Sequence, residues 1–494
     1  MTVHASSDVE EVQLQKSWED EDGEDNNHNR RGGRGTSSFS FTVGGLRHSA
    51  LTLVSTAVGS GVLTVSYMMS LVGVGLGVLM LATGALLAYL SIVSLMQMST
   101  QTGQHSYAAL LAHCAGPRAG PFLDTLLMLF GFGSCVGYLV FVGDFVPDLI
   151  MSVAGTCPEY VRTIAIVGAA VIVTPLSCQR SLDALRCITP LGIISLIFTS
   201  VVVAAMMPGL FSKHNHTLDY GKLEWFTVNT SIFECFAMCI FAFNCHLNVV
   251  PVASGFVRPT RRRIVRVSGS VNMLQVLFYW FIAVTGYMTF LNETPQDILK
   301  GYTQTSVWLV ISRVLLSLTM LVCLPMNIHP SVSSGLQLIA YARSPNEPEW
   351  EVSSPSSPDP SSPNLASPNS ASPNQLTPNR PDELDTELVA RRSRVTATTL
   401  APDVGMLPRT VFSVVLVILA TLTAIAVPGV ADVIQILGAT VATAMMLVVP
   451  AFCMRKVMPR TLGNTLQIVV FLSFACCSIA SVPIKFLRSG GIIS

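Results

Sequence analysis

The first long apolar segment has a run of small residues near its centre. Gly59, Ser60 and Gly61 stand within the stretch Ala57–Leu63. Two glycines around a serine favour a break in the helix, and a break at the bilayer midplane leaves backbone N–H and C=O groups that lipid cannot satisfy. Such groups can bind the charged ends of a small polar molecule. Small residues also let two helices pack closely in lipid, so a binding site and a packing contact are the two alternatives.

The sixth apolar segment has a second irregular stretch, which contains Asn244, His246 and Asn248. Polar side chains of this kind are costly in lipid. Pro251, which follows them, has no N–H group to donate to a helix. The sixth segment crosses the membrane in the direction opposite to the first. We therefore expect it to supply the second half of a site made by two interrupted helices.

Ionisable side chains inside apolar segments are costly enough to indicate a function by default. Glu234 precedes the irregular stretch of the sixth segment, where it could bind a cationic substrate, carry a coupling proton or pair with Arg313. Asp144 and Asp148 are expected near the end of the third segment, either at the membrane interface or on an entry path. His246 is either a packed histidine or a proton carrier, since the unperturbed pKa of histidine is about 6.5.

The composition defines the class of protein. Half of the 494 residues are hydrophobic and only 12% are charged, unlike the usual composition of a soluble domain. The predicted fold class is an all-α membrane protein with about 11 transmembrane helices, each long enough to cross a hydrocarbon core of about 30 Å. The apolar segments lie at 46–70, 71–98, 120–152, 160–178, 187–207, 225–256, 267–291, 305–340, 409–427, 432–454 and 462–487.

Positive charge orients these segments. With the N-terminus in the cytoplasm, 22 of the 29 Lys and Arg residues fall on the cytoplasmic side and six fall on the opposite side. Cytoplasmic loops of membrane proteins carry such an excess. The glycosylation sequons at Asn215 and Asn292 both lie in loops assigned to the opposite side, in agreement with this orientation. We therefore expect a cytoplasmic N-terminus and glycosylation at these two asparagines.

Two polar regions divide the chain. Residues 1–44 are charged and poor in apolar residues, which predicts a disordered cytoplasmic tail. Residues 341–408 form a Ser/Pro-rich cytoplasmic loop, which is either an extended linker or a set of proline-directed phosphorylation sites for kinases. The membrane helices then occupy 45–340 and 409–488, and residues 489–494 form an extracytoplasmic C-terminus.

The 12 cysteines lie mostly within apolar segments, where cysteine behaves as a small hydrophobe. Their spacing indicates no disulfide framework and no metal site, so we expect neither a metal nor a cofactor. The sequence also lacks the Gly-x-Ser-x-Gly, His-Glu-x-x-His and Walker-type motifs. We therefore expect neither an enzyme nor a nucleotide-driven pump, and no nucleic-acid partner.

Further motifs recur along the membrane segments. They are Gly59-Ser60-Gly61-Val62-Leu63 followed by Ser66-Tyr67, the Phe-Cys-His region of the sixth segment, Gly286-Tyr287-Met288-Thr289-Phe290, Leu299-Lys300-Gly301-Tyr302, Leu324-Pro325, Val427-Pro428 and Leu437-Gly438-Ala439-Thr440. Together, over about 45–340 and 409–488, they resemble the amino acid/auxin permease superfamily, and its sodium-coupled neutral amino acid transporter branch in particular. The resemblance implies a leucine-transporter-like fold, with a five-plus-five inverted repeat and one extra helix, and amino acid transport coupled to an ion gradient.

The same resemblance implies a set of substrate contacts. In that family the broken parts of helices one and six hold the α-carboxylate and the α-amine of the substrate. Helix dipoles and freed carbonyl groups suit these two charges. The residues at the matching positions of this chain are Thr56, Ala57, Gly59, Ser60 and Gly61 in the first segment and Phe241, Phe243, Asn244 and Cys245 in the sixth.

The ion site of the family's sodium-dependent members is matched only in part. Those members have an asparagine four residues before the first glycine of the motif, where this chain has Ser55. They also have a hydroxyl late in helix eight, where this chain has Cys323, with Thr319 one turn earlier. A thiol is a poor ligand for a hard cation. Coupling to protons, with His246 as a candidate carrier, or transport driven by membrane potential is therefore an alternative to sodium coupling.

The sequence as a whole predicts a secondary active transporter that moves amino acids across a membrane. Glu234 favours a cationic substrate such as arginine or lysine. The expected partners are the amino acid, H+ or Na+, the lipid bilayer and kinases at the Ser/Pro-rich loop. The plasma membrane and a vacuolar or lysosomal membrane are alternative locations. A receptor or scaffold that keeps the fold and transports little is the competing interpretation.

Overall fold

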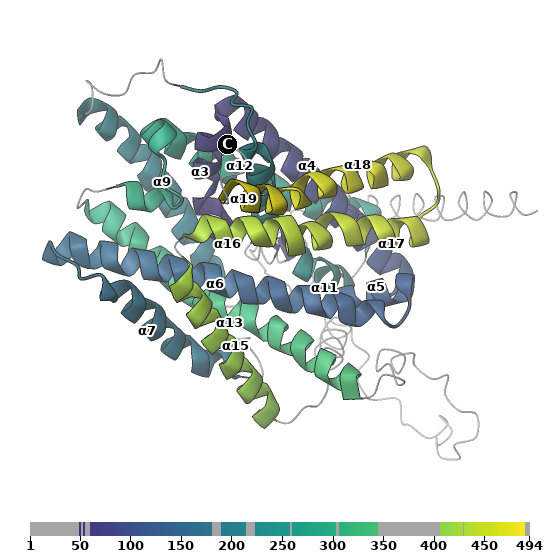
Figure 1. The fold of residues 1–494 in the computed structure, drawn as a ribbon. Coiled ribbons are helices and arrows are strands. Elements are labelled where there is room, and N and C mark those ends of the chain that lie inside the picture. Colours follow the sequence, from purple (N-terminus) through teal and green to yellow (C-terminus); the bar gives the residue numbers. More distant parts are fainter. Residues whose placement is uncertain are drawn as a thin grey trace, which may run out of the picture.

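The computed structural model describes residues 49–50, 53–54, 60–179, 189–213, 223–256, 259–302, 306–343, 406–427 and 429–489. The regular elements in these ranges are all helices, which confirms the predicted all-α class. Nine helices in these ranges are long and apolar enough to cross a membrane, by length and composition. Figure 1 shows the long helices assembled as a bundle.

Eight long helices follow the predicted segments. Helix α13 continues through Pro325 and Pro330, although proline removes a hydrogen bond from the interior of a helix. The eighth predicted segment is therefore one helix. The eight are α4 (Val74–Thr102), α6 (Ala119–Ala154), α7 (Tyr160–Ser177), α9 (Thr189–Lys213), α12 (Arg261–Phe290), α13 (Val307–Arg343), α15 (Met406–Ala426) and α18 (Leu462–Ile479).

Three of the predicted segments are built from shorter helical pieces. The first contains the 3-10 turn η1 (Ser60–Leu63) and α3 (Val65–Val72). The sixth contains α10 (Ser231–Ala242), the 3-10 turn η3 (His246–Asn248) and α11 (Val249–Ser254). The tenth runs without a break through α16 (Val430–Leu437), the π-helical turns η7 (Gly438–Ala442) and η8 (Ala444–Val448), and α17 (Val449–Val457).

Nine of the eleven predicted segments coincide with the nine candidate spans. The other two, 46–70 and 187–207, coincide in the described residues with shorter apolar helices at Gly61–Val72 and Leu191–Met206. The described part of the chain therefore shows nine spans by length, and the total of eleven stays a prediction. The inverted repeat likewise stays a prediction.

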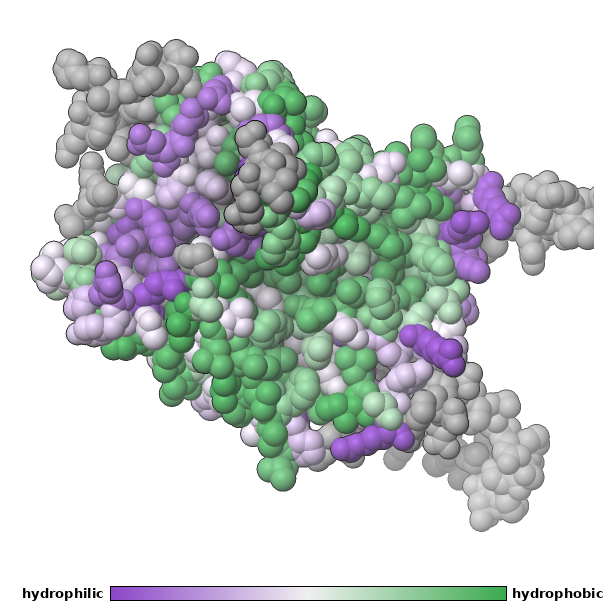
Figure 2. Space-filling model, viewed as in Figure 1, coloured by the Kyte–Doolittle hydropathy of each residue, from purple (hydrophilic) through white to green (hydrophobic). Residues whose placement is uncertain are grey.

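The helices form an inner and an outer group. The spans of α6, of α10 with α11, and of α16 with α17 bury most of their side chains, and α6 packs along α13. The spans of α7, α15 and α18 expose large apolar side chains such as Val171, Leu422 and Leu466. Exposed apolar side chains at this density are suited to lipid rather than water. Figure 2 shows the resulting hydrophobic belt across the middle of the molecule, with hydrophilic residues at its two ends.

One end of the bundle carries most of the polar contacts discussed below. We call it the α19 end, because helix α19 (Ser481–Ser489) lies there, where its Lys485 and Arg488 contact the first turns of α16 and α10. The loop after α12 also lies at this end, and it contains the 3-10 turns η4 (Leu291–Glu293) and η5 (Ile298–Gly301).

Candidate functional site

Helix α10 ends at Ala242 because the sequence offers its backbone other partners. Asn244 Oδ1 accepts a hydrogen bond from the backbone N–H of His246 at 3.0 Å. Local bonds of this kind compete with helical ones. Pro251 lies in the first turn of α11, where a helix leaves its N–H groups unpaired in any case. Residues 243–245 are therefore not helical, and the interruption expected in this segment is present.

The two interrupted segments meet at Gly61 of η1 and Ala242 of α10. A Cβ atom built on Gly61 would lie 2.9 Å from Cα of Ala242 and 3.4 Å from Cδ1 of Phe241. Real Cβ contacts are essentially never this close to backbone, so glycine permits the approach. The turn is closed by Thr64, whose Oγ1 donates to the carbonyl oxygen of Gly61 at 3.0 Å. Close packing, the plainer of the two alternatives for the glycine motif, is thus present at Gly61.

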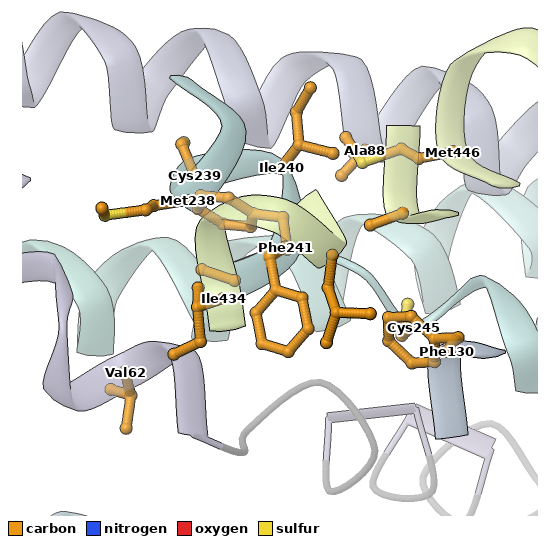
Figure 3. Packing of buried hydrophobic residues seen from close by; sticks show 14 of the residues in the cluster. Val62, Ala88, Phe130, Met238, Cys239, Ile240, Phe241, Cys245, Ile434 and Met446 are labelled. Carbon is orange, nitrogen blue, oxygen red and sulfur yellow. The ribbon is translucent and has the colours of Figure 1, made fainter. Parts of the chain in front are cut away.

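Aromatic side chains line this junction. The ring of Phe241 packs against Phe130 of α6, with 5.8 Å between ring centroids. Figure 3 shows Phe241 between Val62 of η1 and Phe130. Phe243 meets Tyr279 of α12 edge to face, with centroids 5.0 Å apart, and Tyr279 Oη donates to the carbonyl oxygen of Ala242 at 2.7 Å. The wall of the junction is therefore apolar and packed by ring contacts.

Asn244 and Cys245 supply the polar atoms of the junction. Both residues are buried. The Nδ2 group of Asn244 has no hydrogen-bond partner among the residues that the structure describes. A buried donor left unpaired costs about 1–3 kcal/mol. An acceptor brought by a ligand or by water would remove that cost, which makes Asn244 the clearest binding group at this site.

His246 is fully buried and uses both ring nitrogens. Its Nδ1 lies 3.0 Å from Oδ1 of Asn244, and its Nε2 lies 3.0 Å from Oγ of Ser91 on α4. These two contacts fix the ring between η3 and α4. The geometry favours the packed histidine over the proton carrier.

The residues expected at the ion site lie on α13. Thr319 Oγ1 is 3.0 Å from Oγ of Ser195 on α9 and 2.8 Å from the carbonyl oxygen of Leu315. Cys323 is half-buried one turn later, and its carbonyl oxygen accepts from Asn327 Nδ2 at 3.0 Å. The hydroxyl of Thr319 is therefore already engaged in contacts between α9 and α13.

Several predicted residues stand apart from the junction. Asn292 lies exposed in η4, at the α19 end, and its Nδ2 donates to Oε1 of Glu224 at 3.0 Å. Ser60 begins η1, and its side chain is not among those described. The predicted residues outside the described ranges are Ser55, Thr56, Ala57, Gly59 and Asn215.

Glu234, in the first turn of α10, has a partner that the sequence did not indicate. Its Oε1 lies 3.1 Å from Nη1 of Arg488, in α19. The same guanidinium donates to the hydroxyls of Ser231 and Thr230 at 3.1 and 2.7 Å. The pairing considered between Glu234 and Arg313 is therefore wrong, and the C-terminal helix neutralises Glu234 instead.

Arg313 donates hydrogen bonds to the loop after α12. Its Nη2 donates to the carbonyl oxygens of Leu299 and Tyr302, both at 3.0 Å. The same Nη2 lies 3.8 Å from Oδ2 of Asp148, an ion pair without a hydrogen bond. Arg313 thus joins α13 to the loop of η5 and to the end of α6.

Asp144 is the centre of an ion cluster at the α19 end. Its Oδ1 accepts from Nε of Arg162 at 3.1 Å, and its Oδ2 lies 2.8 Å from Nζ of Lys300. Arg162 also donates to the carbonyl oxygen of Val427, which follows α15. The cluster ties α6, α7, η5 and the end of α15 together. Asp144 is buried within the protein.

The described residues define a class of protein before any comparison is made. They form a helical, multi-pass membrane bundle in which two interrupted segments touch, and the junction holds an unpaired amide donor beside an apolar wall. Among them, no group of three or more His, Cys, Asp or Glu side chains is placed to hold a metal ion. Such a junction is suited to binding a small polar molecule.

The chain belongs to the transmembrane amino acid transporter protein family, whose sequence model matches residues 42–493. This finding confirms the resemblance of the motifs to the amino acid/auxin permease superfamily. The family relationship covers the whole described part of the chain.

Individual relatives carry names from the same class. The chain is 30% identical to "Putative amino acid transporter AAT1" of Toxoplasma gondii, over 62% of this chain and 42% of that protein. It is 25% identical to the protein of that name from Plasmodium falciparum, over 64% and 52%. It is 26% identical to "Vacuolar amino acid transporter 7" of Saccharomyces cerevisiae, over 57% of each chain. The matched region thus spans about half the length of these curated relatives.

Among solved structures, the crystal structure of MhsT in complex with L-phenylalanine is similar to this chain. The similarity covers 90% of this chain and 99% of that one, at 10% sequence identity and a TM-score of 0.42.

Proposed function

We propose that this protein is a secondary active transporter of amino acids, and that the substrate binds where η1 meets the end of α10. The observation that carries the proposal is the junction of Gly61 with Ala242, next to the unpaired Nδ2 group of Asn244. The amide would donate to the substrate, whose charged ends face the backbone of the two interrupted helices. Thr56, Ala57, Gly59 and Ser60 belong to this proposed site by their place in the sequence.

The proposed driving ion is a proton rather than sodium. Sodium prefers oxygen ligands, and Cys323 offers sulfur at a position where sodium-dependent relatives have a hydroxyl. The hydroxyl of Thr319 is within hydrogen-bonding distance of Ser195 and Leu315. Sodium coupling through Ser55, Thr319 and Cys323, and transport driven by membrane potential, are the alternatives that the experiment below separates.

The proposed substrates are cationic amino acids such as arginine or lysine, recognised by Glu234. Arg488 occupies this carboxylate in the structure. A basic substrate must therefore displace Arg488 from Glu234. Arg488 thus competes with the cationic side chain of the substrate for this carboxylate. An uncharged substrate side chain would leave the ion pair of Glu234 and Arg488 intact.

The proposed location is a vacuolar or lysosomal membrane, with the plasma membrane as the alternative. The name of the Saccharomyces cerevisiae relative supports this, since that protein is called a vacuolar amino acid transporter. A proton gradient across such a membrane would supply the proposed driving force. The N-terminus is proposed to be cytoplasmic, so that Asn215 and Asn292 face the opposite side and carry glycans, and the loop 341–408 is open to kinases.

Uptake into proteoliposomes tests the proposal. The purified chain is reconstituted, a panel of radiolabelled amino acids is offered, and sodium gradients, pH gradients and membrane potential are imposed separately. We expect saturable uptake of basic amino acids that follows the pH gradient. Saturable binding without uptake under any gradient would contradict transport and favour the receptor or scaffold.

A further inference from the structure

A cleft with a volume of about 280 Å³ opens at the α19 end. Its walls come from α6, from the loop that contains η5 and from the start of α16, and none of its lining residues belongs to η1 or α10. The charged residues in the lining are Asp144, Asp297, Lys300 and Asp432. The cleft is thus separate from the proposed substrate junction, and its volume is near the lower end of the range for small-molecule sites.

Two of the three carboxylates in the cleft are already neutralised. Asp144 lies 3.1 Å from Arg162 and 2.8 Å from Lys300, so it has two cationic partners. Asp432 lies 2.5 Å from Nζ of Lys485 in α19. Asp144 would keep Arg162 as a partner if Lys300 turned away from it.

Asp297 is the exception. It is 1% exposed, and its Oδ1 accepts from the backbone N–H of Leu299 at 3.0 Å, which caps η5. Its Oδ2 is buried and has no hydrogen-bond partner among the described residues. A buried carboxylate oxygen without a donor is costly, so the site is incomplete without a proton or a cationic ligand.

The electrostatics around Asp297 agree with this geometry. Burial is the main cause that raises the pKa of Asp297 to about 7, and the negative charges of Asp144 and Asp148 act in the same direction. The N–H of Leu299 and the ammonium of Lys300 oppose the shift. A ligand ammonium placed at Oδ2 would oppose this shift and favour the ionised carboxylate.

Asp297, with its unpaired Oδ2, and Lys300 are three residues apart and line one small cleft. An α-amino acid carries an ammonium and a carboxylate on one carbon atom, so its two charges match this pair. We propose that the cleft is a second binding site for a zwitterionic amino acid, with the ligand ammonium on Asp297 and the ligand carboxylate on Lys300. The choice of ligand rests on the proposed function, whereas binding in the cleft does not require transport.

In this arrangement Lys300 turns from Asp144 to the ligand. The side chain of Lys300 is 38% exposed, so it has room to reorient, and Asp144 keeps Arg162. Recognition depends on the two α-groups alone. The cleft should therefore accept L-leucine as well as a basic amino acid.

Equilibrium binding of radiolabelled L-leucine to the full chain in nanodiscs at pH 7.5 tests the proposal. Asp297→Asn removes the charge and keeps an oxygen that can accept from Leu299, whereas Lys300→Gln removes the other charge. Each variant should lose one saturable site or weaken it at least tenfold. Glu293→Gln, the same chemical change at an exposed acid of the same loop, is the matched control and should bind like the parent.

Ligand analogues test the two charges independently of mutation. Isopentylamine lacks the carboxylate and 4-methylpentanoic acid lacks the ammonium, so neither should displace L-leucine from the cleft. The proposal is overturned if the parent binds no L-leucine, or if both variants bind it as the parent does. Proteoliposome uptake is measured in parallel. If both variants bind L-leucine as the parent does and the parent shows uptake, only the proposed cleft site is contradicted. If Asp297→Asn loses a binding site and the parent shows no uptake, only the proposed transport is contradicted.

Discussion

Gly61 and Ala242 hold the two interrupted segments in direct contact. They are far apart in the chain, yet a single methyl group on Gly61 would stand 2.9 Å from the Cα atom of Ala242. The contact places η1 beside the break that follows α10, where Asn244 has its unpaired amide donor. The proposed site depends on this approach more than on any one polar side chain.

Gly61→Ala should lower amino acid uptake about tenfold, because overpacking of this kind costs about 1–3 kcal/mol and displaces backbone at the site. The measurement is the initial rate of uptake into proteoliposomes, normalised to reconstituted protein. Gly269→Ala is the matched control, since a Cβ atom on this glycine of α12 meets nothing within 4 Å. Equal rates for both variants would show that the contact does not matter for transport.

Glu234→Gln and Arg488→Gln should act in opposite directions on a basic substrate. Removing the carboxylate should weaken uptake of arginine at least tenfold more than uptake of leucine. Removing Arg488 should raise the apparent affinity for arginine, because the carboxylate then has no internal partner. Competition by unlabelled amino acids measures both effects. If arginine and leucine respond alike to Glu234→Gln, the cationic preference is wrong.

Replacement of sodium by choline should leave uptake unchanged, and an imposed pH gradient should drive it. Cys323→Ala should also have no effect on this behaviour, since the thiol is not expected to bind the driving ion. The measurement is accumulation above equilibrium in vesicles with each gradient imposed alone. Accumulation that requires sodium and disappears in Cys323→Ala would contradict proton coupling.

His246→Gln should lower the melting temperature of the purified protein, because the ring joins Asn244 to Ser91 in a fully buried position. Breaking buried hydrogen bonds of this kind costs about 1–3 kcal/mol. The pH dependence of the remaining uptake should match that of the parent. A pH profile that is lost in the variant would instead identify His246 as the proton carrier.

Asp297 should make the protein less stable as the pH rises from about 4 to about 7. Burial raises the pKa of Asp297 from 3.8 to about 7, so the folded state binds more protons than the unfolded state in this window. Stability from this group is therefore fully present at the acidic side and is lost as the carboxyl ionises. Melting temperatures of Asp297→Asn should fall less between pH 5 and pH 8 than those of the parent, provided no ligand is bound. A parallel fall in both proteins would contradict the shift.

Much of the fold could be predicted because hydropathy is a local property. Nine of the predicted apolar segments coincide with helical spans, and the interruption of the sixth segment followed from Asn244 and Pro251 within a few residues of each other. The glycine motif could likewise be read as a place of close approach. The sixth segment could be named as the partner of this motif because it crosses the membrane in the direction opposite to the first.

Contacts between distant residues could not be predicted in the same way. Arg488 and Glu234 are 254 residues apart, and nothing local marks a C-terminal arginine as the partner of a carboxylate in α10. Lys300 lies in the motif Leu299-Lys300-Gly301-Tyr302 and Asp297 just before it, and their proposed role depends on the residues of α6 and α16 that line the same cleft. The sequence therefore indicated where polar groups are unusual, whereas the tertiary structure decided which of them are already neutralised.

The most direct test of the central claim is an experimental structure of the full chain in nanodiscs with a transported amino acid bound. We predict density for the amino acid between η1 and the end of α10, within hydrogen-bonding distance of Nδ2 of Asn244. Density only in the cleft at Asp297, or elsewhere in the protein, would contradict the proposed transport site.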